Sequence, residues 1–206
     1  MDTTYHIFLI ILIVASLFDL LIPLFLGFKY PNYNHFYDTI STLGTNISPV
    51  KKWEGLNLIL VGILFIVFAF GQRFEFSNNG LIYDLYLMGI VVFGIGCILA
   101  GIFPEDPKGI DETLSGKIHG ISSGFGFIFL ILCPFWAIFI EEYTSNKILN
   151  IVLLILSLLA FILFLISEKS ENGIFKYTGL FQRLNLIFLY SCLIINYITL
   201  LKINEY

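Results

Sequence analysis

Six long apolar stretches follow one another along the chain, and polar segments separate them. An α-helix needs about 20 mostly apolar residues to cross the hydrocarbon core of a bilayer. The stretches of about this length cover residues 7–28, 54–72, 80–103, 117–140, 147–167 and 181–202. The pattern predicts an all-α fold, a polytopic integral membrane bundle of six transmembrane helices, in which residues 1–206 form a single domain.

The first stretch, residues 7–28, has the apolar character of a signal peptide as well as that of a membrane helix. No basic residue precedes it, it is longer than a typical signal-peptide core, and it lacks a clear A-x-A cleavage site. We therefore expect it to be retained as the first helix.

The composition excludes several classes of protein. Hydrophobic residues make up 58% of the chain and charged residues 13%, whereas soluble domains carry about 25% charged residues. A net charge of −4 argues against a nucleic-acid partner, which requires clustered Lys and Arg. Cys97, Cys133 and Cys192 lie within apolar stretches and lack metal-binding spacing, so they are predicted to be small buried hydrophobes.

Basic residues are unevenly divided between the two sides of the predicted bundle. The first, third and fifth connections hold eight of the 11 Lys and Arg residues, and the other side holds Arg73, Lys147 and Lys202. The positive-inside rule then places the odd-numbered connections in the cytoplasm and both termini outside, in a multi-pass protein of the cell membrane. The alternative is that these basic residues serve a ligand. We refer to the side of the odd-numbered connections as the odd-loop face.

Aromatic residues at the ends of the stretches match the belts found at membrane interfaces. Their amphipathic rings lie at the level of the lipid head groups. We expect such interfacial positions for Trp53, Trp136, Tyr30, Tyr143 and Tyr177.

Polar residues gather at the odd-loop face, and several of them lie slightly inside the apolar stretches. The set consists of Asp38, Ser41, Asn57, Asp106, His119, Gln182 and Arg183. It predicts a polar pocket at this face. The alternative is a series of ordinary solvated helix ends.

Glycines mark two of the stretches. Those of the third stretch are predicted to be packing positions: Gly89, Gly94, Gly96 and Gly101. In the fourth stretch glycines recur every four residues and predict a ridge that another helix approaches closely: Gly116, Gly120 and Gly124.

His119 stands with two hydroxyl groups in the fourth stretch. Ser122 and Ser123 follow it at i+3 and i+4, so helical geometry places the three on one face. A histidine and two hydroxyls directed into a packed bundle are uncommon where lipid is the solvent. This favours a functional role, and the alternative is that His119 only joins helices through hydrogen bonds.

Two charged residues need partners. Asp19 lies deep in the first stretch, where an ionised aspartate costs about 2.5–3.5 kcal/mol on insertion scales. It is therefore expected to face the bundle interior, as a paired or protonated group. Arg183 opens the sixth stretch and is expected to pair with Asp38 or Asp106, or to hold a phosphate.

Four short motifs carry a resemblance to a known family. They are YDTISTLG at 37–44, GIFPEDP at 101–107, SGKIHGISSGFGF at 115–127 and GLFQR at 179–183. Together they resemble a six-helix family of prokaryotic membrane proteins, domain of unknown function 998 (DUF998). The resemblance implies this architecture over nearly the whole chain, and it singles out Asp38, Ser41, Pro104, Asp106, His119 and Arg183. A more distant likeness to Frag1-type proteins, which remodel lipid anchors, serves as an analogy only.

The polar face favours a protein that binds or processes a lipid or another amphiphile, with the head group in the pocket and the acyl chains in the bundle. In an enzyme, His119 would be the acid or base and Asp106 its orienting or metal-binding partner. The candidate nucleophiles are Ser41 and Ser123. The expected ligand-binding residues are Arg183 as an anion clamp, Asp38, Ser123 and Asn57.

A metal site has less support from the sequence. Zinc hydrolases of the alkaline-ceramidase type resemble this chain in their serine, aspartate and histidines at helix ends, but they carry a His-x-x-x-His pair on the last helix. The sixth stretch here contains no histidine, and His6 lies across the membrane from His35 and His119. We therefore expect neither a metal nor another cofactor. A site of two histidines with Asp38 or Asp106 is the alternative.

Two other functions are compatible with the sequence. Asp19 and the central glycines suit a small transporter or channel, although the sequence shows no pair of broken helices and no inverted repeat. The second function is that of a non-catalytic membrane assembly partner, and no residue pattern in the sequence points specifically to it.

The predicted topology can be tested by labelling with a membrane-impermeant thiol reagent, after the three native cysteines are replaced by serine. Single cysteines at Asn46, Asp111 and Glu171 should label from one side of the membrane, and a cysteine at Asn78 from the other. Any other distribution of labelling would mean that the number of crossings is wrong.

Overall fold

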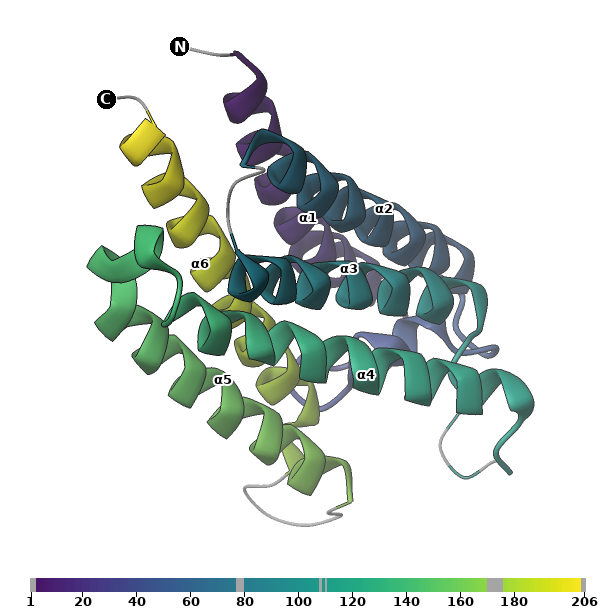
Figure 1. The fold of residues 1–206 in the computed structure, drawn as a ribbon. Coiled ribbons are helices and arrows are strands. Elements are labelled where there is room, and N and C mark those ends of the chain that lie inside the picture. Colours follow the sequence, from purple (N-terminus) through teal and green to yellow (C-terminus); the bar gives the residue numbers. More distant parts are fainter. Residues whose placement is uncertain (1–2, 77–79, 108, 110, 170–175, 205–206) are drawn as a thin grey trace.

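A computed structural model describes the chain except for residues 1–2, 77–79, 108, 110, 170–175 and 205–206. Six long helices run through the described residues, and each is long and apolar enough to cross a membrane (Figure 1). They are α1 (Thr3–Gly27), α2 (Lys51–Glu75), α3 (Leu81–Ile102), α4 (Leu114–Ala137), α5 (Lys147–Glu168) and α6 (Thr178–Asn204). The prediction of an all-α bundle of six transmembrane helices is confirmed. Two of the proposed labelling positions, Asn78 and Glu171, lie outside the described residues.

Several helices extend beyond the apolar stretches that predicted them. α2 begins at Lys51 rather than at residue 54, and α4 begins at Leu114 rather than at residue 117. Hydropathy marks the part of a helix that lies in hydrocarbon, whereas the helix itself continues into polar residues that can be capped. At α4 the cap is Thr113, whose side chain accepts a hydrogen bond from the Gly116 N–H (3.2 Å).

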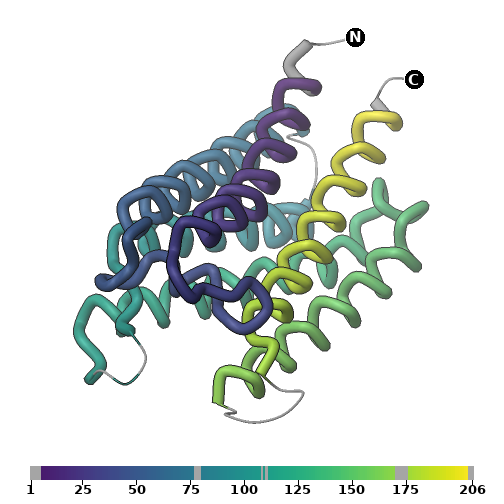
Figure 2. Tube along the Cα trace, turned by 180° about the vertical axis from the view of Figure 1, so that it is seen from behind, coloured from purple at the N-terminus to yellow at the C-terminus, as the bar shows by residue number. Residues whose placement is uncertain are grey.

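The two chain termini lie at one end of the molecule, and the odd-numbered connections lie at the other (Figures 1 and 2). α4 and α5 are joined near the termini by a short 3-10 helix, η2 (Glu141–Asn146), and diverge from there towards the odd-loop face. α6 packs against α1, α4 and α5. The divergence of α4 from α5 leaves the space that forms part of the candidate site.

Glycines allow α3 to pack closely against both α2 and α4. A Cβ atom added at Gly101 would lie 2.5 Å from the Gly55 carbonyl oxygen on α2. One added at Gly96 would lie 2.7 Å from the Ser122 carbonyl oxygen on α4. No side chain fits at such distances, so these glycines of α3 are packing positions, as predicted.

The predicted ridge on α4 is wrong at two of its three glycines. A Cβ atom at Gly120 or Gly124 would meet nothing within 4 Å among the described residues. α4 instead packs on α3 through the face that carries Ser122 and Gly126. The reason is the divergence of α5, the helix that would otherwise cover the face carrying Gly120 and Gly124.

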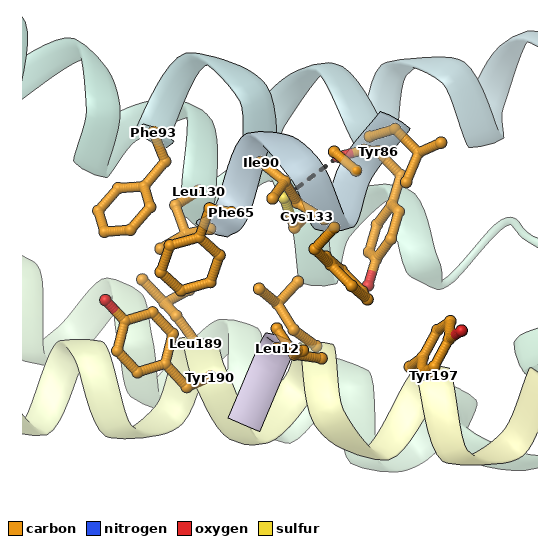
Figure 3. Close-up of a cluster of buried hydrophobic side chains, with 14 of the residues drawn as sticks. Leu12, Phe65, Tyr86, Ile90, Phe93, Leu130, Cys133, Leu189, Tyr190 and Tyr197 are labelled. Carbon is orange, nitrogen blue, oxygen red and sulfur yellow. Dashed lines mark hydrogen bonds between the residues drawn. The ribbon is translucent and has the colours of Figure 1, made fainter. Parts of the chain in front are cut away.

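The core is rich in aromatic rings (Figure 3). Phe65 of α2 lies 5.3 Å, centroid to centroid, from both Phe93 of α3 and Tyr190 of α6. Tyr143 is fully buried against Tyr86, which corrects its predicted interfacial position. The chain turns back into the bundle through η2, and this places the Tyr143 ring inside.

The three cysteines are buried free thiols, as the sequence predicted. Cys133 shows how such a thiol is accommodated, because its S–H donates to the Tyr86 carbonyl oxygen at 3.4 Å (Figure 3). The thiols therefore fill core space as small apolar groups.

Two matched substitutions test the contrast between the glycines. Gly96→Ala should lower the free energy of unfolding in detergent by about 1–3 kcal/mol, because the new methyl group overpacks the α3–α4 contact. Gly120→Ala should leave it unchanged or raise it by up to about 1 kcal/mol, since alanine favours the helix and meets open space. Equal effects of the two substitutions would contradict the packing described here.

Candidate functional site

Asp19 faces the bundle interior, as predicted from the cost of exposing a carboxylate to lipid. It is buried in α1, and the Tyr190 hydroxyl of α6 donates to its Oδ2 at 2.5 Å. This bond joins the middle of the first and last helices. Asp19 is therefore a paired residue within the bundle.

Arg183 fixes the connection between α1 and α2 onto the start of α6. Its Nη1 donates to the carbonyl oxygens of His35 (2.8 Å), Asp38 (3.1 Å) and Gly179 (2.9 Å). Its Nη2 donates to the Tyr33 hydroxyl at 2.7 Å. The expected pairing with an aspartate side chain is thus replaced by bonds to main-chain oxygens. The Asp38 carboxylate instead accepts the Asn34 N–H at 2.8 Å.

Two side chains beside this guanidinium are kept neutral. Burial is the largest influence on Tyr33 and raises its pKa to about 12, despite the opposing charge of Arg183. Burial and the charge of Arg183 both lower the pKa of His35. The Tyr33 hydroxyl therefore accepts from Arg183 as a neutral group at neutral pH.

Gln182 positions the short 3-10 helix η1 (Ser41–Gly44) over the bundle. Its Oε1 accepts the Ile40 N–H at 2.7 Å, and the Leu180 N–H donates to the Phe36 carbonyl oxygen at 3.0 Å. Both bonds join α6 to the connection. They bring Ser41 to the wall of the cavities described below.

His119 lies buried in the second turn of α4 and binds the end of α3. Its Nδ1 is 2.9 Å from the Phe103 carbonyl oxygen and 3.2 Å from that of Ala100. Because carbonyl oxygens only accept, Nδ1 carries the hydrogen, and in the neutral ring Nε2 is an acceptor. Nε2 is buried and finds no hydrogen-bond partner in the described part of the chain.

The Asp106 carboxylate binds the turn that leads into α4, and it does not bind His119. Its carboxylate accepts the N–H of Thr113 at 2.7 Å and the Thr113 hydroxyl at 2.9 Å. Thr113 is the residue that caps α4. The expected pair of Asp106 with His119 is therefore not formed. Carbonyl oxygens at the end of α3 orient the His119 ring instead.

The two candidate nucleophiles are not paired with a base. The Ser123 hydroxyl donates to the His119 carbonyl oxygen at 2.7 Å, one helical turn back. Within the described residues His119 Nε2 has no partner, so neither Ser123 nor Ser41 is hydrogen-bonded to it. The geometry supplies an acceptor but no activated hydroxyl.

A cavity lies between α4 and α5 where the two helices diverge, and we call it the lateral cavity. It contains about 590 Å³ of unfilled space, its mouth included. Gly120 and Leu165 on its wall are exposed on the outside of the bundle, so the cavity opens towards lipid. One side is polar and the other apolar; its lining includes Ser41, His119, Ser123, Gln182, Phe161 and Phe164.

A second, inner cavity continues the lateral cavity into the bundle. The two share Ser41, Ser123, Phe127 and Gln182. The inner cavity is small, with a volume of about 40 Å³, and it reaches Asp19. Most of its wall is apolar.

A third, outer cavity lies at the odd-loop face. It is lined by threonines and by acidic side chains, among them Asp38, Asp106 and Glu168, and it shares Thr39, Glu105 and Glu168 with the lateral cavity. The structure therefore divides the single pocket that the sequence predicted. Ser41 and His119 line the lateral cavity, and Asp38 and Asp106 line the outer one. Of the described cavities, none is lined by Arg183 or Asn57.

Asn57 lies instead between α1 and α2, where its Nδ2 donates to the Phe18 carbonyl oxygen at 3.4 Å. One turn before it on the same face is Glu54, which is fully buried. The pattern of apolar stretches does not single out Glu54, which lies at the edge of one. Its signal was the helical spacing of the buried side of α2, in which Glu54 precedes Asn57, Leu58 and Val61.

Among the described residues, no three His, Cys, Asp or Glu side chains come close enough to hold a metal ion. The alternative metal site of two histidines with Asp38 or Asp106 is therefore not formed by the described residues.

Arg183→Lys tests the role of the guanidinium. A single ammonium group cannot reproduce bonds to four oxygen atoms, so the connection between α1 and α2 should open more often. Hydrogen exchange of its amides should accelerate by about tenfold or more, since hydrogen bonds from a charged donor contribute about 1.5–3 kcal/mol. Lys52→Ala, at an exposed position near the same face, is the control and should leave exchange unchanged.

Comparison with known proteins gives one match. Residues 13–196, from within α1 to within α6, match a family model described as "Protein of unknown function (DUF998)". The matched segment contains every site residue discussed above. Searches of curated proteins and of solved structures found no match.

Proposed function

The chain belongs to the DUF998 family, a description that assigns no activity, and from its own geometry we propose that it binds an amphiphile in the lateral cavity. The ligand enters sideways from the bilayer, between α4 and α5. Its hydrocarbon chain lies against α5, and a hydroxyl or amine hydrogen near its head group binds His119. The resemblance to prokaryotic proteins favours the cell membrane as the bilayer concerned.

The observation that carries this proposal is the free acceptor of His119. Nδ1 is committed to the carbonyl oxygens of α3, so Nε2 is the ring nitrogen left for a ligand. A buried acceptor without a donor costs about 1–3 kcal/mol. An O–H or N–H of a bound amphiphile removes this cost, and lipid alkyl chains cannot.

The opposite wall supports the apolar half of the ligand. Phe161, Phe164 and Leu165 of α5 face the cavity together with Phe127 of α4. A head group has room in the outer cavity, which has a volume of about 370 Å³.

Binding, rather than hydrolysis, is the function that this arrangement supports. An acyl-transfer site needs a nucleophile within hydrogen-bond reach of a base. His119 is oriented by α3, and the nearby serine hydroxyl of Ser123 donates to a main-chain oxygen. The transport and assembly roles derive no specific support from these contacts.

Filling the cavity should abolish binding without unfolding the protein. In Gly124→Leu the new side chain extends into the lateral cavity, because a Cβ there meets nothing within 4 Å among the described residues. We expect the affinity for a fluorescent monoacylglycerol in detergent to fall by at least about tenfold, with no loss of thermal stability. The control is Ile128→Phe, one turn further on α4 and half-exposed, which should bind normally. Unchanged binding by Gly124→Leu would refute the proposed site.

Two substitutions at His119 separate its two nitrogens. Asparagine carries its amide nitrogen on Cγ, as histidine carries Nδ1, so His119→Asn keeps the bonds to α3 and loses the free acceptor. Its affinity for the monoacylglycerol should fall about tenfold, the equivalent of one hydrogen bond, with little change in stability. His119→Gln loses the Nδ1 donor and should be less stable. If His119→Asn binds as well as the wild type, Nε2 does not contact the ligand.

A further inference from the structure

Glu54 is a buried acid that takes no part in the cavities. It lies in the first turns of α2, under η1, with no measurable exposure to the surroundings. Both of its carboxyl oxygens are buried and find no hydrogen-bond partner among the residues that the structure describes. An ionised carboxylate without a single donor is strongly disfavoured in such a place.

Asn57 supplies what a protonated Glu54 needs. The two residues are three positions apart on one buried face of α2, which is contact distance on a helix. Asn57 Nδ2 already donates to the Phe18 carbonyl oxygen, whereas its Oδ1 is buried and lacks a donor within the described chain. Protonation of Glu54 creates an O–H donor one turn from this acceptor, so one proton both neutralises the buried carboxylate and gives Asn57 Oδ1 a donor.

The charges around Glu54 point the same way. The titratable groups near enough to act on Glu54 electrostatically are Asp19 of α1, Tyr33 of the connection between α1 and α2, Cys97 of α3 and Arg183 of α6. Arg183 is the cation of this group, and Asp19 and Glu54 are its two carboxyl groups. One positive charge balances one carboxylate. Asp19 has a donor in the Tyr190 hydroxyl, and Glu54 has none in the described residues.

We propose that Glu54 is a proton-binding site, which holds a proton in the resting protein while Asp19 remains the anion that balances Arg183. The bound proton lies on a Glu54 oxygen and is shared with Asn57 Oδ1. Its release would place a second anion beside Asp19, inside the bundle. This site is independent of any amphiphile in the lateral cavity.

If Glu54 holds this proton, the stability of the folded protein must fall as pH rises. A proton that only the folded protein holds stabilises the fold for as long as it stays bound, and this stabilisation is lost when rising pH removes the proton. Wild-type protein should lose stability on alkalinisation even though its surface charges change little there.

Glu54→Gln is the decisive variant, because an amide has the shape of the neutral acid and can donate to Asn57. Purified in detergent and measured near neutral pH, it should unfold at the same temperature as the wild type or at a higher one. Between about pH 6 and 9 the wild type should lose several degrees of unfolding temperature, and Glu54→Gln should lose less. Glu112→Gln, an exposed position, is the control and should follow the wild type.

Infrared spectroscopy of the wild-type protein gives a second measurement that does not depend on a variant folding. A carbonyl band of a protonated carboxylic acid should be present at about pH 7, disappear reversibly at alkaline pH, and be missing in Glu54→Gln but not in Glu112→Gln. The proposal is overturned if the wild type lacks this band at about pH 7, or if Glu54→Gln retains it. It is equally overturned if Glu54→Gln destabilises the protein across the whole pH range, as the loss of an ionised partner would.

Discussion

The guanidinium of Arg183 joins two parts of the chain that are about 150 residues apart in sequence, and the odd-loop end of the bundle depends on this junction. Its four acceptors include Tyr33 and the carbonyl oxygens of His35 and Asp38, so one side chain orders a connection that has little regular structure of its own. Once the connection is in place, η1 covers Glu54 and presents Ser41 to the cavities. The candidate site is therefore built by the last helix acting on the first connection.

Inside a bilayer, a polar group must find its partner within the protein, and the buried polar groups of this bundle meet the requirement to different degrees. Asn146, Asn150 and Asn196 form a bonded amide network between η2, α5 and α6. Other buried groups find no partner among the described residues; they include the Gln72 amide towards the termini, and His119 Nε2 and the Glu54 carboxyl group towards the odd-loop face. Networks of the first kind stabilise helix packing, whereas unmatched groups such as His119 Nε2 and Glu54 are where a ligand or a proton has most to contribute.

Sequence alone predicted the helices and the inward position of Asp19, because both follow from the large cost of exposing polar atoms to hydrocarbon. It could not predict the partners of Arg183, since backbone oxygens of a loop carry no sequence signature. The glycine ridge of α4 failed for a related reason: regular spacing shows that a helix could approach at Gly120 and Gly124, but not that one does. Glu54 was predictable from the helical period of α2. It was overlooked because it stands beside charged residues at the end of an apolar stretch.

The polar character of α6 has a consequence for how the protein enters the membrane. It is less apolar than α5 and carries buried amides such as Asn185 and Asn196. The Asn185 amide donates to the Ser157 carbonyl oxygen of α5, and the Asn196 amide pairs with Asn150 of the same helix. Because α6 follows α5 in the chain, it leaves the ribosome after these partners have been made. The α5–α6 hairpin is therefore a natural unit of insertion, in which an apolar helix carries a polar one into lipid.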